Sequence, residues 1–213
     1  MRTRAAVLTG AVSLAALAAC GSTGDAGTRV SPAASESPLS SGPAASAAAD
    51  LVAAAALAGC PASDPSVAAR AGGLPDLTLP CLGQGPAVRL AGLRGTPTVV
   101  NVWASWCGPC RAELELFATL DSSGGGAVRV LGLDASDDPS SALSLLRDAG
   151  AHHPSVRDDA GRTKGSLRWG SGLPVTYFVD ADGVIVYEKH GAVTGAAELR
   201  GLVADHLGVT VPS

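Results

Sequence analysis

The stretch TVVNVWASWCGPCRAE, residues 98–113, determines how the rest of the chain is interpreted. Its first part, Thr98 to Ala104, is a nearly continuous apolar run, which predicts a buried strand. A helix with its apolar residues on one face is predicted directly after it, from Arg111 to Leu120. Cys107 and Cys110 are three positions apart in the sequence. The predicted elements place them where a buried strand passes into a helix.

This position at the start of a helix makes the two thiols reactive. A helix N-terminus carries unpaired N–H groups and a partial positive charge, which stabilise a thiolate. We predict that Cys107 is the nucleophile and that Cys110 resolves the mixed disulfide. Pro109 has no N–H and a fixed φ, so it suits the first helical turn.

Three other interpretations of the cysteine pair stay open: half of a zinc site, an inert structural disulfide and a peroxide-reducing cysteine. A zinc site needs a second cysteine pair or a histidine pair, and His152-His153 lacks the matching spacing. We predict no metal and no cofactor, and we assign no ligand role to His152, His153, His190 or His206.

The rest of the chain alternates strands and helices. Asp182-Gly183 between two apolar runs predicts a hairpin turn. The resulting order predicts an α/β fold, with a central mixed sheet that ends in an antiparallel hairpin and helices on both faces. The expected strands are 88–90, 98–104, 127–133, 175–179 and 184–188, and the expected helices are 111–120, 136–149 and 195–207.

Residues 99–113 resemble the thioredoxin superfamily, and within it the membrane-anchored extracytoplasmic group that includes TlpA, ResA and CcmG-type proteins. The resemblance extends from about Gly73 to Gly208. It implies a thioredoxin-like fold and thiol-disulfide oxidoreductase activity. GLPVTYFVD, residues 172–180, resembles the family's cis-proline strand. The resemblance thus implies a cis Pro174 that packs on the dithiol, with Leu173 contacting the substrate. We expect Trp106, Gly108 and Pro109 to complete the substrate-binding surface.

The chain departs from the family pattern at two positions. Asn101 stands where cytoplasmic thioredoxins have a buried Asp, and it cannot titrate. Glu113 is then the candidate catalytic proton acceptor, although it could equally be a first-turn residue that interacts with the helix dipole. Glu115 replaces a Pro that kinks this helix in the group, so a straighter helix is expected.

Cys60 and Cys81 remain once the other cysteines are assigned. They lie 21 positions apart, and each is next to a proline. An unpaired surface thiol is a liability in an oxidising compartment, so we predict a structural disulfide between them. A second redox pair is the alternative.

The N-terminus has the pattern of an export signal. Arg2 and Arg4 precede a short, weakly apolar stretch that ends in LAACG, residues 17–21, which resembles the bacterial lipobox. We therefore predict a lipoprotein signal peptide over 1–19, lipidation of Cys20 and a lipid-anchored flexible linker over 20–49. An ordinary secretory signal is the alternative. We place an N-terminal extension with the disulfide at 50–86, starting in a short helix capped by Asp50, and a thioredoxin-like domain at 87–213.

Composition excludes some functions. The 213 residues carry 15 Lys and Arg against 19 Asp and Glu, a net charge of −4, so no basic excess exists to bind nucleic acid. Because no apolar run of about 18 residues occurs after the N-terminal segment, a polytopic membrane protein is excluded.

These observations predict an extracytoplasmic, lipid-anchored, monomeric enzyme that exchanges its dithiol with the cysteines of other proteins. The resemblance favours a reductant, in cytochrome c maturation, with a transmembrane thiol donor or acceptor as partner. The alternatives are an oxidative disulfide-forming catalyst, a Sco-like copper-delivery protein that uses His190, and a lipoprotein that only docks partners.

Overall fold

A computed structural model describes residues 43–212. The predicted signal peptide, the predicted lipidation site Cys20 and residues 20–42 of the predicted linker lie outside the described residues. Within residues 43–212, no helix is both long enough and apolar enough to cross a membrane.

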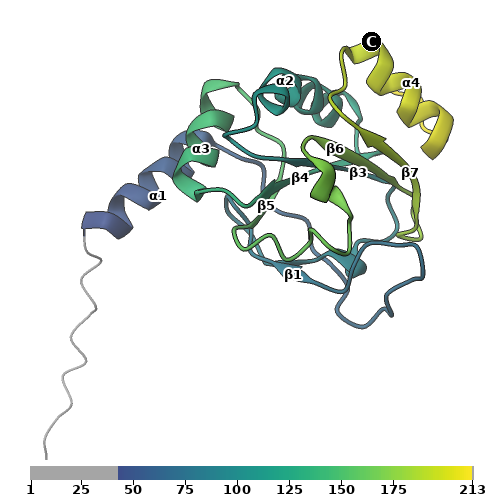
Figure 1. The fold of residues 1–213 in the computed structure, drawn as a ribbon, viewed down its shortest axis with the longest axis horizontal. Coiled ribbons are helices and arrows are strands. Elements are labelled where there is room, and N and C mark those ends of the chain that lie inside the picture. Colours follow the sequence, from purple (N-terminus) through teal and green to yellow (C-terminus); the bar gives the residue numbers. More distant parts are fainter. Residues whose placement is uncertain (1–42, 213) are drawn as a thin grey trace, which may run out of the picture. The chain divides into compact units, whose positions relative to one another are not determined.

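The centre of the fold is a mixed five-stranded sheet in the order β5-β4-β3-β6-β7 (Figure 1). The central strand β3 runs parallel to β4 and antiparallel to β6, and β7 pairs antiparallel with β6. This confirms the predicted mixed sheet and its terminal hairpin. The strands are β3 (Thr98–Trp103), β4 (Arg129–Ala135), β5 (Ser155–Asp158), β6 (Val175–Val179) and β7 (Ile185–His190).

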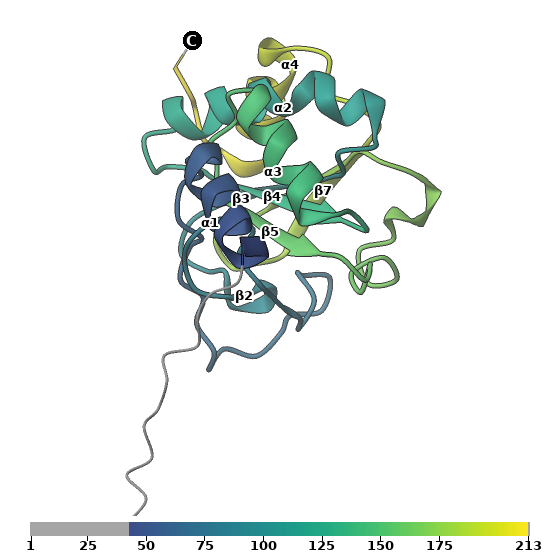
Figure 2. The same cartoon turned by 90° about the vertical axis from the view of Figure 1, so that its left-hand side faces the viewer.

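The two faces of the sheet are covered differently (Figures 1 and 2). One face packs against three α-helices: α2 (Gly108–Ser123), α3 (Pro139–Asp148) and α4 (Ala196–Leu207). The opposite face is covered by the small hairpin of β1 (Thr78–Leu79) and β2 (Val88–Arg89) and by two short 3-10 helices, η1 (Leu90–Gly92) and η2 (Trp169–Ser171). Helical residues thus cover both faces, as α-helices on one and as 3-10 turns on the other.

Local sequence sets where these helices begin and end. The side chain of Asp138 accepts a hydrogen bond from the Ser141 N–H (2.9 Å), and Pro139 occupies the first turn of α3. Helix α4 ends at Gly208, whose φ of +66° is a left-handed conformation that glycine adopts without strain. The start of α2 is part of the candidate site.

The N-terminal helix α1 (Pro43–Ala55) packs against α3. It begins seven residues before Asp50, which lies inside the helix, so the prediction that Asp50 caps it was wrong. The cause is the run of alanines before Asp50, because alanine has the highest helix propensity. Leu51 and Val52 pack against the core between α2 and α3.

The extension after α1 completes the edge of the sheet at β5, a strand that the sequence analysis did not predict. The Leu82 N–H donates to the Ser155 carbonyl (2.8 Å), and the Arg157 N–H donates to the Pro80 carbonyl (3.0 Å). A disulfide joins Cys60 to Cys81 beside these contacts. Leu74 and Leu79 of the extension lie in the same core as strands β3 and β4. The extension therefore packs into the domain rather than outside it.

We predict that the Cys60–Cys81 disulfide stabilises the fold and takes no part in thiol exchange. Replacing both cysteines by serine should lower the free energy of unfolding by about 3 kcal/mol, the value for closing a loop of about 20 residues. Thermal unfolding of the double variant measures this effect. Unchanged stability together with lost exchange activity would show that the pair is redox-active instead.

Candidate active site

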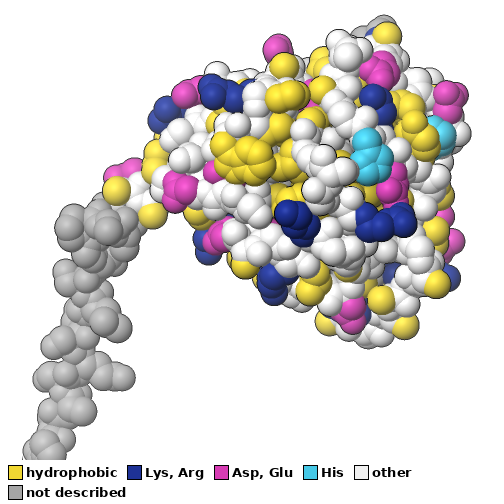
Figure 3. All heavy atoms as spheres, in the orientation of Figure 1, with side chains coloured by type: hydrophobic (Ala, Val, Ile, Leu, Met, Phe, Trp, Pro, Cys, Tyr) yellow, Lys and Arg dark blue, Asp and Glu magenta, His cyan; other side chains and the backbone are white. Residues whose placement is uncertain are grey.

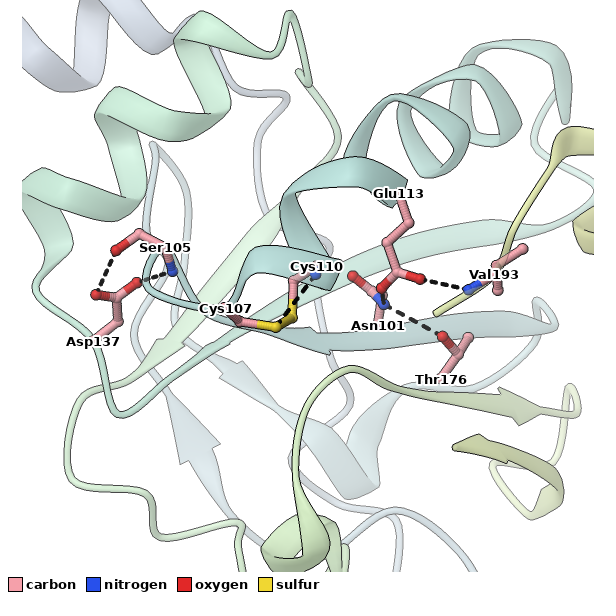
Figure 4. The surroundings of a disulfide bond; sticks show 8 residues. All are labelled: Asn101, Ser105, Cys107, Cys110, Glu113, Asp137, Thr176 and Val193. Atoms are coloured by element: carbon pink, nitrogen blue, oxygen red, sulfur yellow. Dashed lines mark hydrogen bonds between the residues drawn. A yellow bond between two sulfur atoms is a disulfide. The ribbon is translucent and has the colours of Figure 1, made fainter. Parts of the chain in front are cut away.

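Cys107 and Cys110 lie where strand β3 passes into helix α2, and a disulfide joins them (Figure 4). Cys107 is the N-cap of α2, and its Sγ accepts a hydrogen bond from the Cys110 N–H (3.3 Å). Pro109 occupies the first turn. The sulfur of Cys107 therefore lies against the free N–H groups of the helix, where a thiolate is stabilised. The side chain of Cys107 is 5% exposed and that of Cys110 is fully buried.

The residues expected to bind substrate surround the dithiol on the surface. Gly108 and Pro109 are exposed, and Trp106 is 62% exposed. The indole of Trp106 donates from Nε1 to the Ser136 carbonyl (3.1 Å), which ties the exposed ring to the loop after β4.

The Leu173–Pro174 peptide bond is cis, as the resemblance implies. Pro174 is buried at the start of β6. Leu173 is half-buried and packs against the core cluster that contains Cys107 and Cys110. The fold thus brings this segment to the dithiol from more than 60 residues away in the sequence.

Glu113 is fully buried one turn beyond Cys110. Its Oε1 accepts a hydrogen bond from Asn101 Nδ2 (2.9 Å), and its Oε2 accepts one from the Val193 N–H (2.8 Å) (Figure 4). Burial raises the pKa of Glu113 to about 7, although these two hydrogen bonds act in the opposite direction. The carboxyl can therefore gain or lose a proton near neutral pH.

Asn101 has a role that sequence reasoning missed. Its amide holds Glu113 and also donates to Thr176 Oγ1 (3.3 Å) on β6. The non-titrating Asn and the Glu thus form one buried unit on the helix-covered face of the sheet. The sequence signal was a polar residue within the apolar run of β3, opposite an acid in the following helix.

A second acidic group lies on the other side of the dithiol. The Asp137 carboxylate accepts hydrogen bonds from the backbone N–H of Ser105 and from its Oγ (2.8 Å), two residues before Cys107 (Figure 4). Asp134 on β4 is also fully buried, and burial raises its pKa to about 9. Sequence reasoning missed both, although an Asp in the apolar strand sequence VLGLDA, residues 130–135, was a visible signal.

The histidines lie in varied surroundings. His152 Nδ1 is 3.0 Å from the Ala55 carbonyl, and the half-exposed His190 lies 3.5 Å from the Glu188 carboxylate. His153 is buried, which lowers its pKa to about 4. In the part of the chain that the structure describes, no group of three His, Cys, Asp or Glu residues could hold a metal ion.

Comparison with known proteins gives consistent matches. The family model described as Redoxin matches residues 70–204. The chain is 34% identical over 119 residues to the thiol:disulfide interchange protein CycY of Rhizobium leguminosarum bv. viciae, a match that covers 55% of this chain and 62% of CycY. It is 37% identical over 100 residues to the thiol:disulfide interchange protein DsbE of Haemophilus influenzae, covering 47% and 54% of the two chains. The match therefore spans less than two thirds of either relative.

Solved structures resemble the fold. A thiol:disulfide interchange protein of the thioredoxin family from Chlorobium tepidum superimposes with a TM-score of 0.55 at 21% identity, over 67% of this chain and 100% of its own. A secreted thiol-disulfide isomerase from Corynebacterium glutamicum gives a TM-score of 0.52 at 27% identity, over 62% and 81% of the two chains. These matches confirm the predicted thioredoxin-like fold.

We predict that Cys107 reacts before Cys110. In the reduced protein, the thiol at the helix start should be the better nucleophile because it is the less deeply buried of the two and lies against the helix N–H groups. Brief alkylation near pH 7 followed by peptide mass spectrometry should find the label on Cys107. Earlier labelling of Cys110 would reverse the two roles.

We predict that Glu113→Gln removes a pH-dependent loss of stability. The pKa of Glu113 in the folded protein is about 7, above its ordinary value of 4.5. The stability that Glu113 adds to the fold is therefore fully present below about pH 4.5 and is lost as the pH rises through 7. The loss amounts to about 3 kcal/mol. Denaturant unfolding across this range should show a decrease in stability that is larger in the wild type than in Glu113→Gln by about this amount, because Asp134 titrates in both proteins.

The Gln side chain can be accommodated because Asn101 Oδ1 has no hydrogen-bond partner, so its amide can turn to accept from the new NH₂ group. The matched control is Glu115→Gln, since Glu115 is an exposed residue of the same helix. Parallel pH–stability curves for wild type and Glu113→Gln would show that Glu113 does not titrate as described.

Proposed function

Because this chain belongs to the Redoxin family, we propose that it is a thiol-disulfide oxidoreductase that exchanges the Cys107–Cys110 pair with cysteines of other proteins. The observation that carries the proposal is the dithiol at the start of α2, with the cis-Pro174 segment packed beside it. The relatives CycY and DsbE are thiol:disulfide interchange proteins, which names the same class of reaction.

The proposed reaction runs in two steps. The Cys107 thiolate attacks a substrate disulfide, forming an S–S bond to one substrate sulfur and releasing the other as a thiolate that takes up a proton. Cys110 then loses its proton and attacks Cys107 Sγ, which closes the Cys107–Cys110 disulfide and releases the second substrate thiol. Two electrons pass from the chain to the substrate, and the reverse sequence oxidises a substrate dithiol.

Glu113 is the proposed acceptor for the Cys110 proton. It lies one helical turn beyond Cys110, on the same side of α2, and its pKa of about 7 matches a group that exchanges protons near neutral pH. Its carboxylate is held by Asn101 and Val193 rather than by its own helix. These tertiary contacts favour the proton-acceptor role over a simple interaction with the helix dipole.

The proposed substrate surface consists of Trp106, Gly108, Pro109 and the Leu173–Pro174 segment. The exposed indole and the exposed turn at the helix start offer an apolar contact next to Cys107. Leu173 supplies backbone groups that an extended peptide can pair with. Figure 3 shows one face of the domain, on which charges of both signs lie among hydrophobic and uncharged side chains.

We place the enzyme outside the cytoplasm, attached through a lipid on Cys20 and a linker. There it works as a reductant, with apocytochrome c cysteines as substrate and a transmembrane thiol donor as the source of electrons. Cys60 and Cys81 form its structural disulfide. This assignment rests on the sequence resemblance and on the lipobox.

The direction of exchange is tested by the reduction potential of the Cys107–Cys110 pair in glutathione buffers. Related dithiols span about −270 to −120 mV, and a reductant should lie towards the lower limit. The reduced protein should also reduce a synthetic peptide that carries a Cys-x-x-Cys disulfide. Cys110→Ser should stop at the mixed disulfide, and Cys107→Ser should form none. A potential near −120 mV, with rapid oxidation of a reduced peptide, would establish the oxidative alternative.

A further inference from the structure

Asp134 lies at the end of strand β4, in register with Trp103 of β3. Trp103 packs in the same core cluster as Cys107 and Cys110. The Asp134 side chain is fully buried, and no N–H group donates to either of its carboxyl oxygens, while the Asp137 carboxyl group lies within hydrogen-bonding reach of it. A buried carboxylate without donors is costly, so the group is expected to carry its proton.

The charges that act most strongly on Asp134 are all negative and belong to Asp137, Asp138 and Asp159. Strand β5, on the other side of β4, places no unpaired positive charge beside Asp134. Arg157 of β5 is in register with Asp134, but its guanidinium pairs with the Asp159 carboxylate (3.0 Å). His153, just before β5, is uncharged near pH 7 because burial lowers its pKa to about 4.

Asp137 is the natural acceptor for the Asp134 proton. Its carboxylate already accepts hydrogen bonds from the Ser105 N–H, from Ser105 Oγ and from the Asp138 N–H (2.8 Å). The neighbouring Ser136 carbonyl accepts from Trp106 Nε1. Residues 136 and 137 therefore hold the loop before Cys107 at two points.

We propose that Asp134 is a positioning residue for the dithiol: its protonated carboxyl donates a hydrogen bond to the Asp137 carboxylate and so keeps Asp137 on Ser105. A neutral acid supplies the one O–H donor that the group can offer, and a carboxylate is the strongest acceptor beside it. Loss of this proton would place two negative charges side by side and push Asp137 away from the Cys107 loop. The inference rests on the proposed function only in taking Cys107 as the reacting thiol.

The test compares Asp134→Asn, which keeps an N–H donor towards Asp137, with Asp134→Leu, which removes it. Asp121→Asn is the matched control, because Asp121 is a partly buried acid whose pKa is also raised by burial but which lies near the far end of α2. All variants are made in the Cys110→Ser background, so that one active-site thiol titrates. The readout is the rate of Cys107 alkylation between pH 6 and pH 10.

The wild type should show the titration of Cys107 and a second change in rate near pH 9. Asp134→Asn should keep the wild-type rate near pH 7 and lose the second change. Asp134→Leu should change the rate near pH 7 by roughly two- to tenfold, the effect of losing one hydrogen bond. Asp121→Asn should behave as the wild type.

Infrared spectra provide a direct readout that does not depend on Asp134→Leu folding. Near pH 8 Glu113 is mostly ionised, so a protonated carboxyl band that Asp134→Asn lacks must come from Asp134. The same band in both proteins, or the same alkaline change in rate, would overturn the proposal. Exchange with a peptide disulfide is measured separately, so failure of the proposed function would be recognised on its own.

Discussion

The junction at which β3 becomes α2 is the constraint on which the rest of the site depends. The strand is buried along its whole length at the centre of the sheet, so it fixes where the chain emerges. Cys107 then caps the helix through its own sulfur, and Pro109 limits the conformations of the first turn. The sulfur that caps the helix is also the reactive atom. Formation of the helix therefore creates the surroundings that stabilise the thiolate. The cis-Pro174 segment and the Asp137 contact with Ser105 are both positioned relative to this junction.

Two buried acids lie on elements next to the dithiol, Glu113 on α2 and Asp134 on β4. Glu113 is held by Asn101 and Val193, whereas no N–H group donates to either carboxyl oxygen of Asp134. Burial is the first cause of the raised pKa of each. Buried acids whose pKa is raised reduce stability near neutral pH, so their presence favours a functional role over a structural one. They also suit a reaction in which thiols must gain and lose protons close to where those acids titrate.

Sequence predicted the elements whose periodicity is strong: β3, α2, α3, the β6–β7 hairpin and α4 lie within a few residues of expectation. It missed β5, because SVRD is short and half polar and is buried only once Pro80 and Leu82 pair with it. Spacing placed Glu113 on the Cys110 side of its helix. Its Val193 partner, 80 residues away, and the Asp137 contact with Ser105 depend on tertiary packing and have no local signal.

The central claim is that the start of α2 stabilises a thiolate at Cys107. The most direct measurement is the pKa of that thiol in the reduced protein, followed by ultraviolet thiolate absorbance across pH, with Cys110→Ser used to isolate the Cys107 signal. A pKa clearly below the value of about 8.5 for free cysteine is predicted, within the roughly 3.5–7.5 range of activated thiols. A pKa at or above 8.5 would contradict the account, because Cys107 would then gain nothing from its position at the helix start.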